Sequence, residues 1–370
     1  MGMRTKRNIN ITNSTLPVLV NRPSWPRPQH LPLGRLHRMA WRDVGKADGE
    51  PWLLLHGGPG SSCQPGMLRP FDLLQQRVIA PDQRGCGASR PKGRTAGNHT
   101  AALVADMEAL REHLGLERWS VLAGSWGTVV ALAYTLAHPQ RVQRLVLRGA
   151  FALSRREVAG LLLPSSRVRQ SLGWSALWPV VPGTVLPVAL QRLTQLIQSG
   201  IPTVASLRAA RGWGLLEMAS AARGQRRSML HAASVSPHLA ASIRREWASI
   251  RRAQKRSTAK LNTPGKTRAD GNALAKFRIQ AHYLRHRGFL QSGQLNRGVL
   301  QAARHGIPVD WVHGSFDVVC PPTNSRRWAT LGRAAGGGVV LVEPCSGHLG
   351  HEPDMLSALR TSVRNALGRC

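Results

Sequence analysis

The segment WSVLAGSWGTVVALAYTLA, residues 119–137, constrains the fold of this chain more than any other. It begins with a short apolar run typical of a buried strand and ends with a run typical of a helix. Gly124 and Gly127 surround Ser125 at the junction, so the strand passes into the helix within a few small residues. A strand followed at once by a helix is the repeating unit of a parallel α/β sheet.

The same alternation recurs on both sides of this segment. Further strand-like runs stand at residues 33–45, 51–60, 76–89, 142–150, 307–317 and 337–348, and helix-like runs at 100–116 and 354–367. Short apolar strands alternating with helices predict a mostly parallel α/β sheet covered by helices.

The middle of the chain has a different texture. Residues 153–296 lack strong strand runs and are mostly helical in pattern, apart from a polar, Gly/Pro-punctuated loop at 255–272. We therefore expect an α/β core built from residues 31–152 and 297–370, interrupted by a helical insertion at 153–296. Residues 1–30 contain several prolines and are expected to be a loose N-terminal extension.

Composition limits the classes of partner. The formal net charge is +33, but the excess is mostly arginine spread along the whole chain, without a Cys/His finger, an RNA-binding aromatic motif or a basic heptad region. We expect no specific nucleic-acid partner and attribute the charge to solubility. No apolar run approaches the roughly 18 residues of a membrane span, so none is expected.

The cysteines argue against a disulfide framework and against a zinc ribbon. There are five, an odd number, and they are scattered without a C-x-x-C pair. A reduced, cytoplasmic setting without a metal site is the expectation.

Ser125 has two interpretations. A serine between a strand and a helix, flanked by small residues, is typical of a nucleophile at a sharp turn, but a tight turn with no catalytic role uses the same residues. A serine hydrolase also requires a histidine base, a carboxylate that orients it, and donors for the oxyanion. These partners, if present further along the chain, decide between the two interpretations.

Candidates for both partners follow in the expected order. In serine hydrolases built on a parallel sheet the order along the chain is Ser, acid, His, each at the carboxyl end of a strand. Asp317 follows the apolar run VDWV, and His348 follows VVLV near the C-terminus. Asp310, inside the strand-like run, is the rival acid, and His351 is the alternative base.

Donors for the oxyanion are expected from two backbone segments. One is the N–H of Trp126, directly after the serine, and the other comes from the glycine-rich loop HGGPG at 56–60, which follows an apolar run. Glycine lets the backbone approach a substrate closely because it has no Cβ.

Several of these segments together resemble one known family. HGGPG, DQRGCGASRP, AGSWGTVVALAYTLAHP, RLVLRGAF, GSFDVVCPP and SGH are similar to segments of the proline iminopeptidases, also called prolyl aminopeptidases. The resemblance extends over residues 33–360 and is densest in 51–152. It implies an α/β-hydrolase fold whose insertion is a helical cap over the substrate. It also implies release of N-terminal proline from peptides without a cofactor.

The resemblance assigns roles to individual residues. It implies that Ser125 is the nucleophile, Asp317 the acid and His348 the base, with Gly58 and Trp126 lining the oxyanion hole. One departure is at the elbow, where Ala123 stands at the first position of the usual G-G-S-W-G.

The expected substrate-binding residues depart further. Family members hold the substrate's α-ammonium with a glutamate in a W-x-x-W-E segment and a second glutamate in an I-E-x-H-Y-F segment. We match the first segment to AASIRREWAS, with Trp247 on its second tryptophan and Ala248 in place of the glutamate. In the second segment Gln280 replaces the glutamate. Loss of two charge-assisted contacts, each worth roughly 1.5–3 kcal/mol, weakens selection of a free amine.

Three functional hypotheses follow. The first is a prolyl aminopeptidase acting on small peptides. The second is an esterase or amidase of the same fold, acting on a substrate without a free α-amine. The third is a binding protein on a hydrolase scaffold, which the complete Ser, Asp, His order disfavours.

Overall fold

The computed structural model describes residues 25–163, 172–181, 185–198, 202–261, 263 and 267–364. Of the extension expected at 1–30, residues 1–24 lie outside the described residues, and the last two residues, Gln29 and His30, open the first strand.

Eight strands form one sheet in the order β1-β2-β4-β3-β5-β6-β7-β8. They are β1 (Gln29–Leu33), β2 (His37–Gly45), β3 (Glu50–Leu55), β4 (Gln76–Pro81), β5 (Trp119–Gly124), β6 (Val142–Arg148), β7 (Val309–Val312) and β8 (Val339–Val342). Every pair from β4 to β8 is parallel, whereas β2 is antiparallel to both of its neighbours. The mostly parallel α/β sheet is confirmed.

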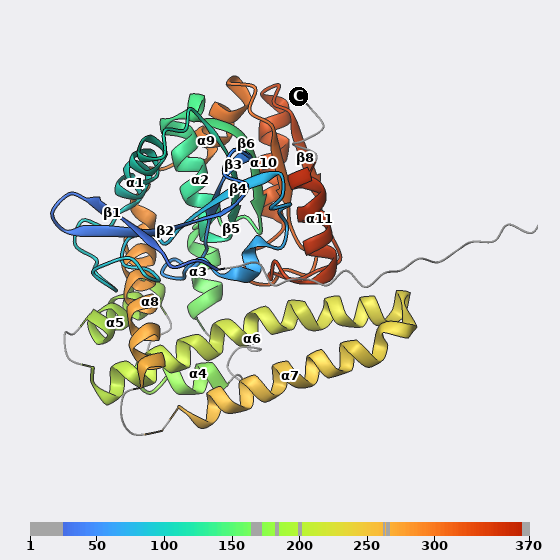
Figure 1. Cartoon of the computed structure of the whole chain (residues 1–370). Coiled ribbons are helices and arrows are strands. Elements are labelled where there is room, and N and C mark those ends of the chain that lie inside the picture. The colour runs from blue at the N-terminus through green and yellow to red at the C-terminus, as the bar shows by residue number, and fades with distance from the viewer. Residues whose placement is uncertain are drawn as a thin grey trace, which may run out of the picture.

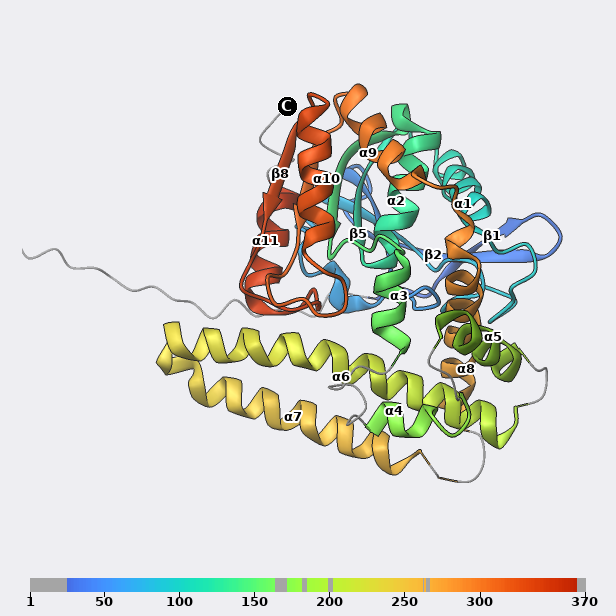
Figure 2. The same ribbon diagram turned by 180° about the vertical axis from the view of Figure 1, so that it is seen from behind.

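Helices cover both faces of this sheet (Figures 1 and 2). One face packs against α1 (Thr100–His113), α2 (Trp126–Ala137), α9 (Gln294–Arg304) and α10 (Thr323–Ala334). The other face packs against α11 (Pro353–Arg364) and the short turn η1 (Pro65–Leu68). Central strands buried on both faces explain why their sequences are continuous apolar runs rather than alternating ones.

Two of these helices are not foreseen by the sequence. The sequence pattern singles out neither α9 nor α10. Residues 294–296, which we assigned to the insertion, begin α9, and α9 packs on α2 of the core. Their contact is close, since a Cβ at Gly298 would lie 2.5 Å from the carbonyl oxygen of Leu132.

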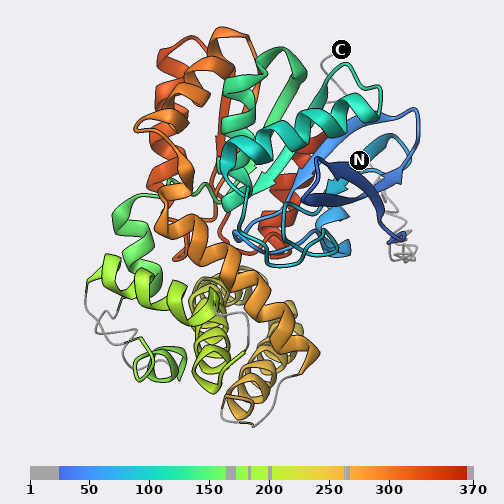
Figure 3. The same cartoon turned by 90° about the vertical axis from the view of Figure 1, so that its left-hand side faces the viewer.

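The helices α3 to α8 lie between β6 and β7 in the chain, and we call them the insertion. They are α3 (Arg155–Leu162), α4 (Leu172–Leu177), α5 (Leu186–Gln198), α6 (Val204–Val235), α7 (Ala240–Ala259) and α8 (Arg268–Arg285). Figure 1 shows α6 and α7 as a long pair under the core, with α6 nearer to the sheet and α8 rising from this layer to the core. Figure 3 shows the same layer with α6 and α7 seen nearly end-on. None of the described helices is long and apolar enough to cross a membrane.

Glycines mark two of the close contacts between the insertion and the core. A Cβ on Gly60 would lie 2.2 Å from the carbonyl oxygen of Lys276 on α8. A Cβ on Gly224, in α6, would lie 2.8 Å from the carbonyl oxygen of Phe316 and 3.0 Å from Cα of Gly347. Both helices therefore rest directly on backbone of the loops that follow β3, β7 and β8.

Candidate active site

Ser125 occupies a strained turn between β5 and α2. Its φ of 56° and ψ of −123° are unusual for any residue other than glycine. The turn is also crowded. A Cβ on Gly57 would lie 3.1 Å from Cβ of Ser125, and one on Gly127 would lie 2.6 Å from the carbonyl oxygen of Leu55. Small residues around Ser125 therefore allow the strained turn and leave its hydroxyl facing the cavity.

Asp317 and His348 are joined at the carboxyl ends of β7 and β8. Nδ1 of His348 lies 2.7 Å from Oδ2 of Asp317, and Oδ1 of Asp317 accepts hydrogen bonds from the amides of Val319 and Cys320. Burial by itself raises the pKa of Asp317. The charge of His348 and hydrogen bonds from His313 and His348 outweigh it and hold that pKa well below its ordinary value. Asp317 is therefore an ionised partner for the imidazole.

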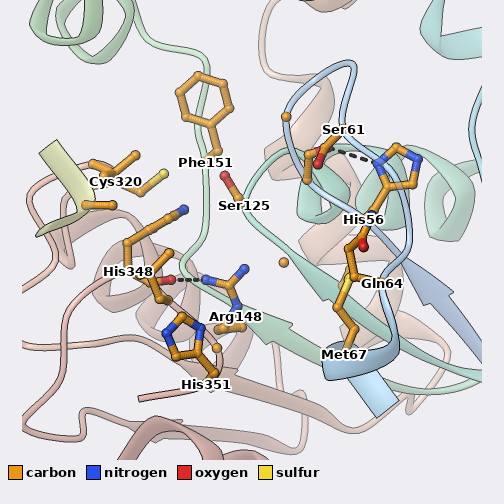
Figure 4. A pocket seen from close by; sticks show the side chains of 18 of the residues that line it. His56, Ser61, Gln64, Met67, Ser125, Arg148, Phe151, Cys320, His348 and His351 are labelled. Atoms are coloured by element: carbon orange, nitrogen blue, oxygen red, sulfur yellow. Dashed lines mark hydrogen bonds between the residues drawn. The ribbon is translucent and has the colours of Figure 1, made fainter. Parts of the chain in front are cut away.

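The two rival residues have different positions. Asp310 forms a buried ion pair with Arg144, 3.1 Å away, on the face of the sheet covered by α11. His351 is exposed and lies at the rim of the cavity that His348 also lines (Figure 4).

Ser125 and His348 both line one cavity of about 720 Å³. Its wall includes Ser125, His348, Gly57 and Gly58, together with side chains from α6 and α8. Figure 4 shows Ser125 and His348 facing the same space, with Arg148 donating a hydrogen bond to the backbone carbonyl of His348. Its volume is in the usual range for small-molecule sites.

The glycine loop and the serine turn are connected by Gln83, which the sequence does not single out. The Gln83 side chain donates to the carbonyl of His56 and accepts a hydrogen bond from the indole of Trp126. The backbone N–H of Gln83 donates to Nε2 of His56. Burial lowers the pKa of this imidazole. A neutral His56 is consistent with that acceptor role. The Trp126 amide lies in the first turn of α2, where N–H groups have no partner inside the helix.

Cys320 is another nucleophilic side chain on this wall. Burial raises the pKa of its thiol well above the ordinary value, and the charge of Asp317 raises it further. The thiol therefore stays protonated, which makes it a poor nucleophile compared with a thiolate.

Comparison with known proteins agrees with this geometry. The sequence model of the α/β hydrolase fold matches residues 50–354. A proline iminopeptidase of Xylella fastidiosa is 32% identical over 87% of this chain and 91% of its own length. This chain belongs to the proline iminopeptidase family. A probable proline iminopeptidase of Leptolyngbya boryana, also 32% identical, matches 89% of this chain and 90% of its own length.

Solved structures extend the likeness of fold beyond the proline iminopeptidase family. The esterase E22 has a TM-score of 0.59 at 14% identity, with 92% of this chain and 99% of that chain covered. A thermophilic esterase from Thermogutta terrifontis has a TM-score of 0.56 at 17% identity, with 93% and 99% covered. At these identities the likeness concerns the fold alone.

The two substrate-binding residues expected from the family motifs have different positions. Gln280, only 3% exposed, lines the cavity from α8. Trp247 lies on α7, which packs on the side of α6 away from the core (Figure 1). It is not among the described residues that line the cavity. Its assignment to the substrate site is not supported by this placement, and Ala248 is beside it on the same helix.

Helix α6 carries a carboxylate that is not among the site residues predicted from the sequence. Glu217 lines the same cavity as Ser125, and its Oε1 lies 2.5 Å from Nε2 of Gln280. The segment Trp213-Gly214-Leu215-Leu216-Glu217 has the spacing of the family's W-x-x-W-E motif, with Leu in place of the second tryptophan. That spacing is the signal that could have identified Glu217.

Proposed function

We propose that this protein releases N-terminal proline from small peptides through an acyl-enzyme on Ser125. The observation that carries the proposal is the position of Glu217, a carboxylate in the wall of the cavity that also contains Ser125 and His348. A free amine bound at Glu217 explains how such a site selects the end of a chain.

The chemistry follows from the arrangement around Ser125. His348 takes the hydroxyl proton as Ser125 Oγ attacks the substrate carbonyl, and Asp317 keeps the imidazole in the tautomer with hydrogen on Nδ1. Backbone amides of Gly58 and Trp126 stabilise the oxyanion. His348 then gives its proton to the leaving amine, and water, activated by the same base, hydrolyses the ester to free proline and Ser125.

The amine subsite suits a prolyl N-terminus. A prolyl ammonium is secondary and has two N–H donors. Glu217 offers a carboxylate acceptor, and Oε1 of Gln280 is buried and accepts no hydrogen bond from the part of the chain that the structure describes. Charge-assisted contacts of this kind are worth about 1.5–3 kcal/mol. The apolar walls at Phe151, Leu161 and Met218 suit the pyrrolidine ring.

The test compares three substrates on one enzyme. We expect hydrolysis of proline 7-amido-4-methylcoumarin to exceed that of its N-acetyl derivative, and Ser125→Ala to lose both activities together with labelling by a fluorophosphonate. Glu217→Gln is expected to raise KM for the free-amine substrate and leave a p-nitrophenyl ester much less affected. Preference for the N-acetyl substrate or the ester would instead support the esterase or amidase hypothesis, which the Gln280 replacement favours.

A further inference from the structure

The carboxylate of Glu217 already has a cation beside it. Nζ of Lys276 on α8 lies 2.5 Å from Oε2 of Glu217, while Gln280 occupies Oε1 at 2.5 Å. Lys276 and Gln280 are one helical turn apart, so α8 presents both side chains to the same carboxylate. All three residues line the cavity that contains Ser125.

This contact changes the charge of the amine subsite. Glu217 and Lys276 together are neutral, and Gln280 contributes no charge. A substrate ammonium that entered beside an unmoved Lys276 would place two cations against one carboxylate, and the repulsion between the two cations would offset part of the attraction to Glu217. The side chains of Lys276 and Glu217 are 32% and 29% exposed, so solvent reduces this repulsion but does not remove it.

We propose that Lys276 determines substrate specificity by occupying Glu217 in the free enzyme, so that a substrate ammonium binds by displacing the lysine ammonium. This inference rests on the proposed function and names the group with which the substrate competes. Binding is then an exchange of one cation for another, and the selectivity for a free amine is smaller than an unoccupied carboxylate provides.

The two neighbours of Glu217 differ in their freedom to move. Lys276 is partly exposed on a flexible stem, and its Nζ, while paired with Glu217, also lies 4.7 Å from the centroid of the Phe277 ring, a cation contact that does not depend on Glu217. Gln280 is 3% exposed and is held within α8. Displacement of Lys276 therefore leaves Glu217 and Oε1 of Gln280 as the two acceptors for the substrate.

The experiment removes the lysine charge and keeps the length of the side chain. We expect Lys276→Met to lower KM for proline 7-amido-4-methylcoumarin about tenfold, and to strengthen competitive inhibition by pyrrolidine, a secondary ammonium without a carbonyl, by a similar factor. The matched control is Lys255→Met, which removes one charge from an exposed position on α7 and is expected to change both values less than twofold. Lys276→Gln serves as a second variant if Lys276→Met unfolds at a lower temperature.

Two results overturn the exchange. One is an unchanged or weaker affinity for pyrrolidine in both Lys276 variants, and the other is an equal gain in the Lys255 control, which would indicate a general effect of net charge. Pyrrolidine inhibition is measured against a p-nitrophenyl ester as well as the amide. If the wild-type enzyme does not cleave the prolyl amide, the proposed function fails, while the ester assay still decides whether Lys276 competes with an ammonium.

Discussion

Oδ2 of Asp317 lies 2.7 Å from Nδ1 of His348, although 31 positions separate the two residues in the chain. Each follows a parallel strand, β7 or β8, so the shared edge of the sheet brings the two loops together. A second imidazole, Nε2 of His313, lies 3.4 Å from the same oxygen. The carboxylate is thus surrounded by donors and has one orientation.

Asp317→Asn is expected to reduce kcat by about 10³–10⁴-fold, because an amide in this place favours the wrong tautomer of the imidazole. The measurement is kcat for a p-nitrophenyl ester and for the prolyl amide. Asp310→Asn is the control: it weakens the ion pair with Arg144 and lowers the melting temperature, but keeps kcat of the folded enzyme within a few-fold. Equal losses of kcat in both variants would contradict the assignment of the acid.

Gly60→Ala is expected to disturb the contact between the glycine loop and α8. Gly60 has φ of 91°, and a Cβ there would lie 2.2 Å from the carbonyl oxygen of Lys276. We expect a loss of about 1–3 kcal/mol in the free energy of unfolding from strain, together with reduced kcat/KM. Gly336→Ala is the control, because Gly336 has a φ of 80° with nothing within 4 Å of an added Cβ, so it isolates the conformational effect. If both substitutions cost the same, the close contact with α8 has no energetic weight.

Gly124→Ala is expected to lower kcat at least about tenfold. A Cβ at this position would lie 2.3 Å from Nη2 of Arg148, whose guanidinium also donates to the carbonyl of His348. Displacing Arg148 then shifts the loop that carries the base, and shifts near 1 Å in such groups are costly to rate. Gly160→Ala, in a helix with open space around it, is the control and keeps full activity. Undiminished kcat in Gly124→Ala would show that Arg148 does not position His348.

Asp270 makes the stability of the insertion depend on pH. The hydrogen bond from Arg211 holds the pKa of this carboxylate well below its ordinary value; burial opposes this shift, and bonds from Thr267 support it. A lowered pKa in the folded state stabilises the protein above the unfolded pKa of about 3.9, and that stabilisation is lost as pH falls below it. We expect Asp270→Asn to melt at a lower temperature than the wild type at pH 7, with a smaller difference at pH 3.

The control for this pH effect is Asp48→Asn, since Asp48 is 80% exposed and forms a surface ion pair with the exposed Lys46. It is expected to change the melting temperature little at either pH. A difference for Asp270→Asn that stays constant from pH 7 to pH 3 would assign its effect to packing rather than to ionisation.

The sequence predicts some parts of this site far better than others. Ser125, Asp317 and His348 each follow an apolar run that predicts a strand. Because the carboxyl ends of parallel strands lie at the same end of the sheet, residues that follow such runs can be predicted to lie close together. Glu217 is different: the spacing of residues 213–217 marks it only by comparison with the family motif, and the pattern of the long helix α6 does not reveal which of its residues face the core. That Glu217 lines the cavity depends on the contact of Gly224 with Gly347, a tertiary approach that the helix pattern does not predict.

The same reason explains the choice of Trp247. The residues around Trp247 resemble the family's W-x-x-W-E segment because they place a tryptophan among charged residues on a predicted helix. In the structure α7 packs on α6 rather than over the cavity. The sequence does not predict the helices α9 and α10, because neither contains an apolar run as clear as those of the strands. Their packing on α2 and β8 supplies what the local pattern lacks.

The glycines under α6 and α8 also affect how this scaffold could be redesigned. Because the two helices rest on backbone at Gly60 and Gly347, a chimera that received these helices from another hydrolase would retain their position only if side chains stayed absent at both points. Exchange of the whole insertion therefore risks losing the alignment of Glu217 with Ser125. Point substitutions at Glu217, Lys276 and Gln280 leave the backbone contacts at these glycines unchanged. They are therefore the more direct route to a new specificity.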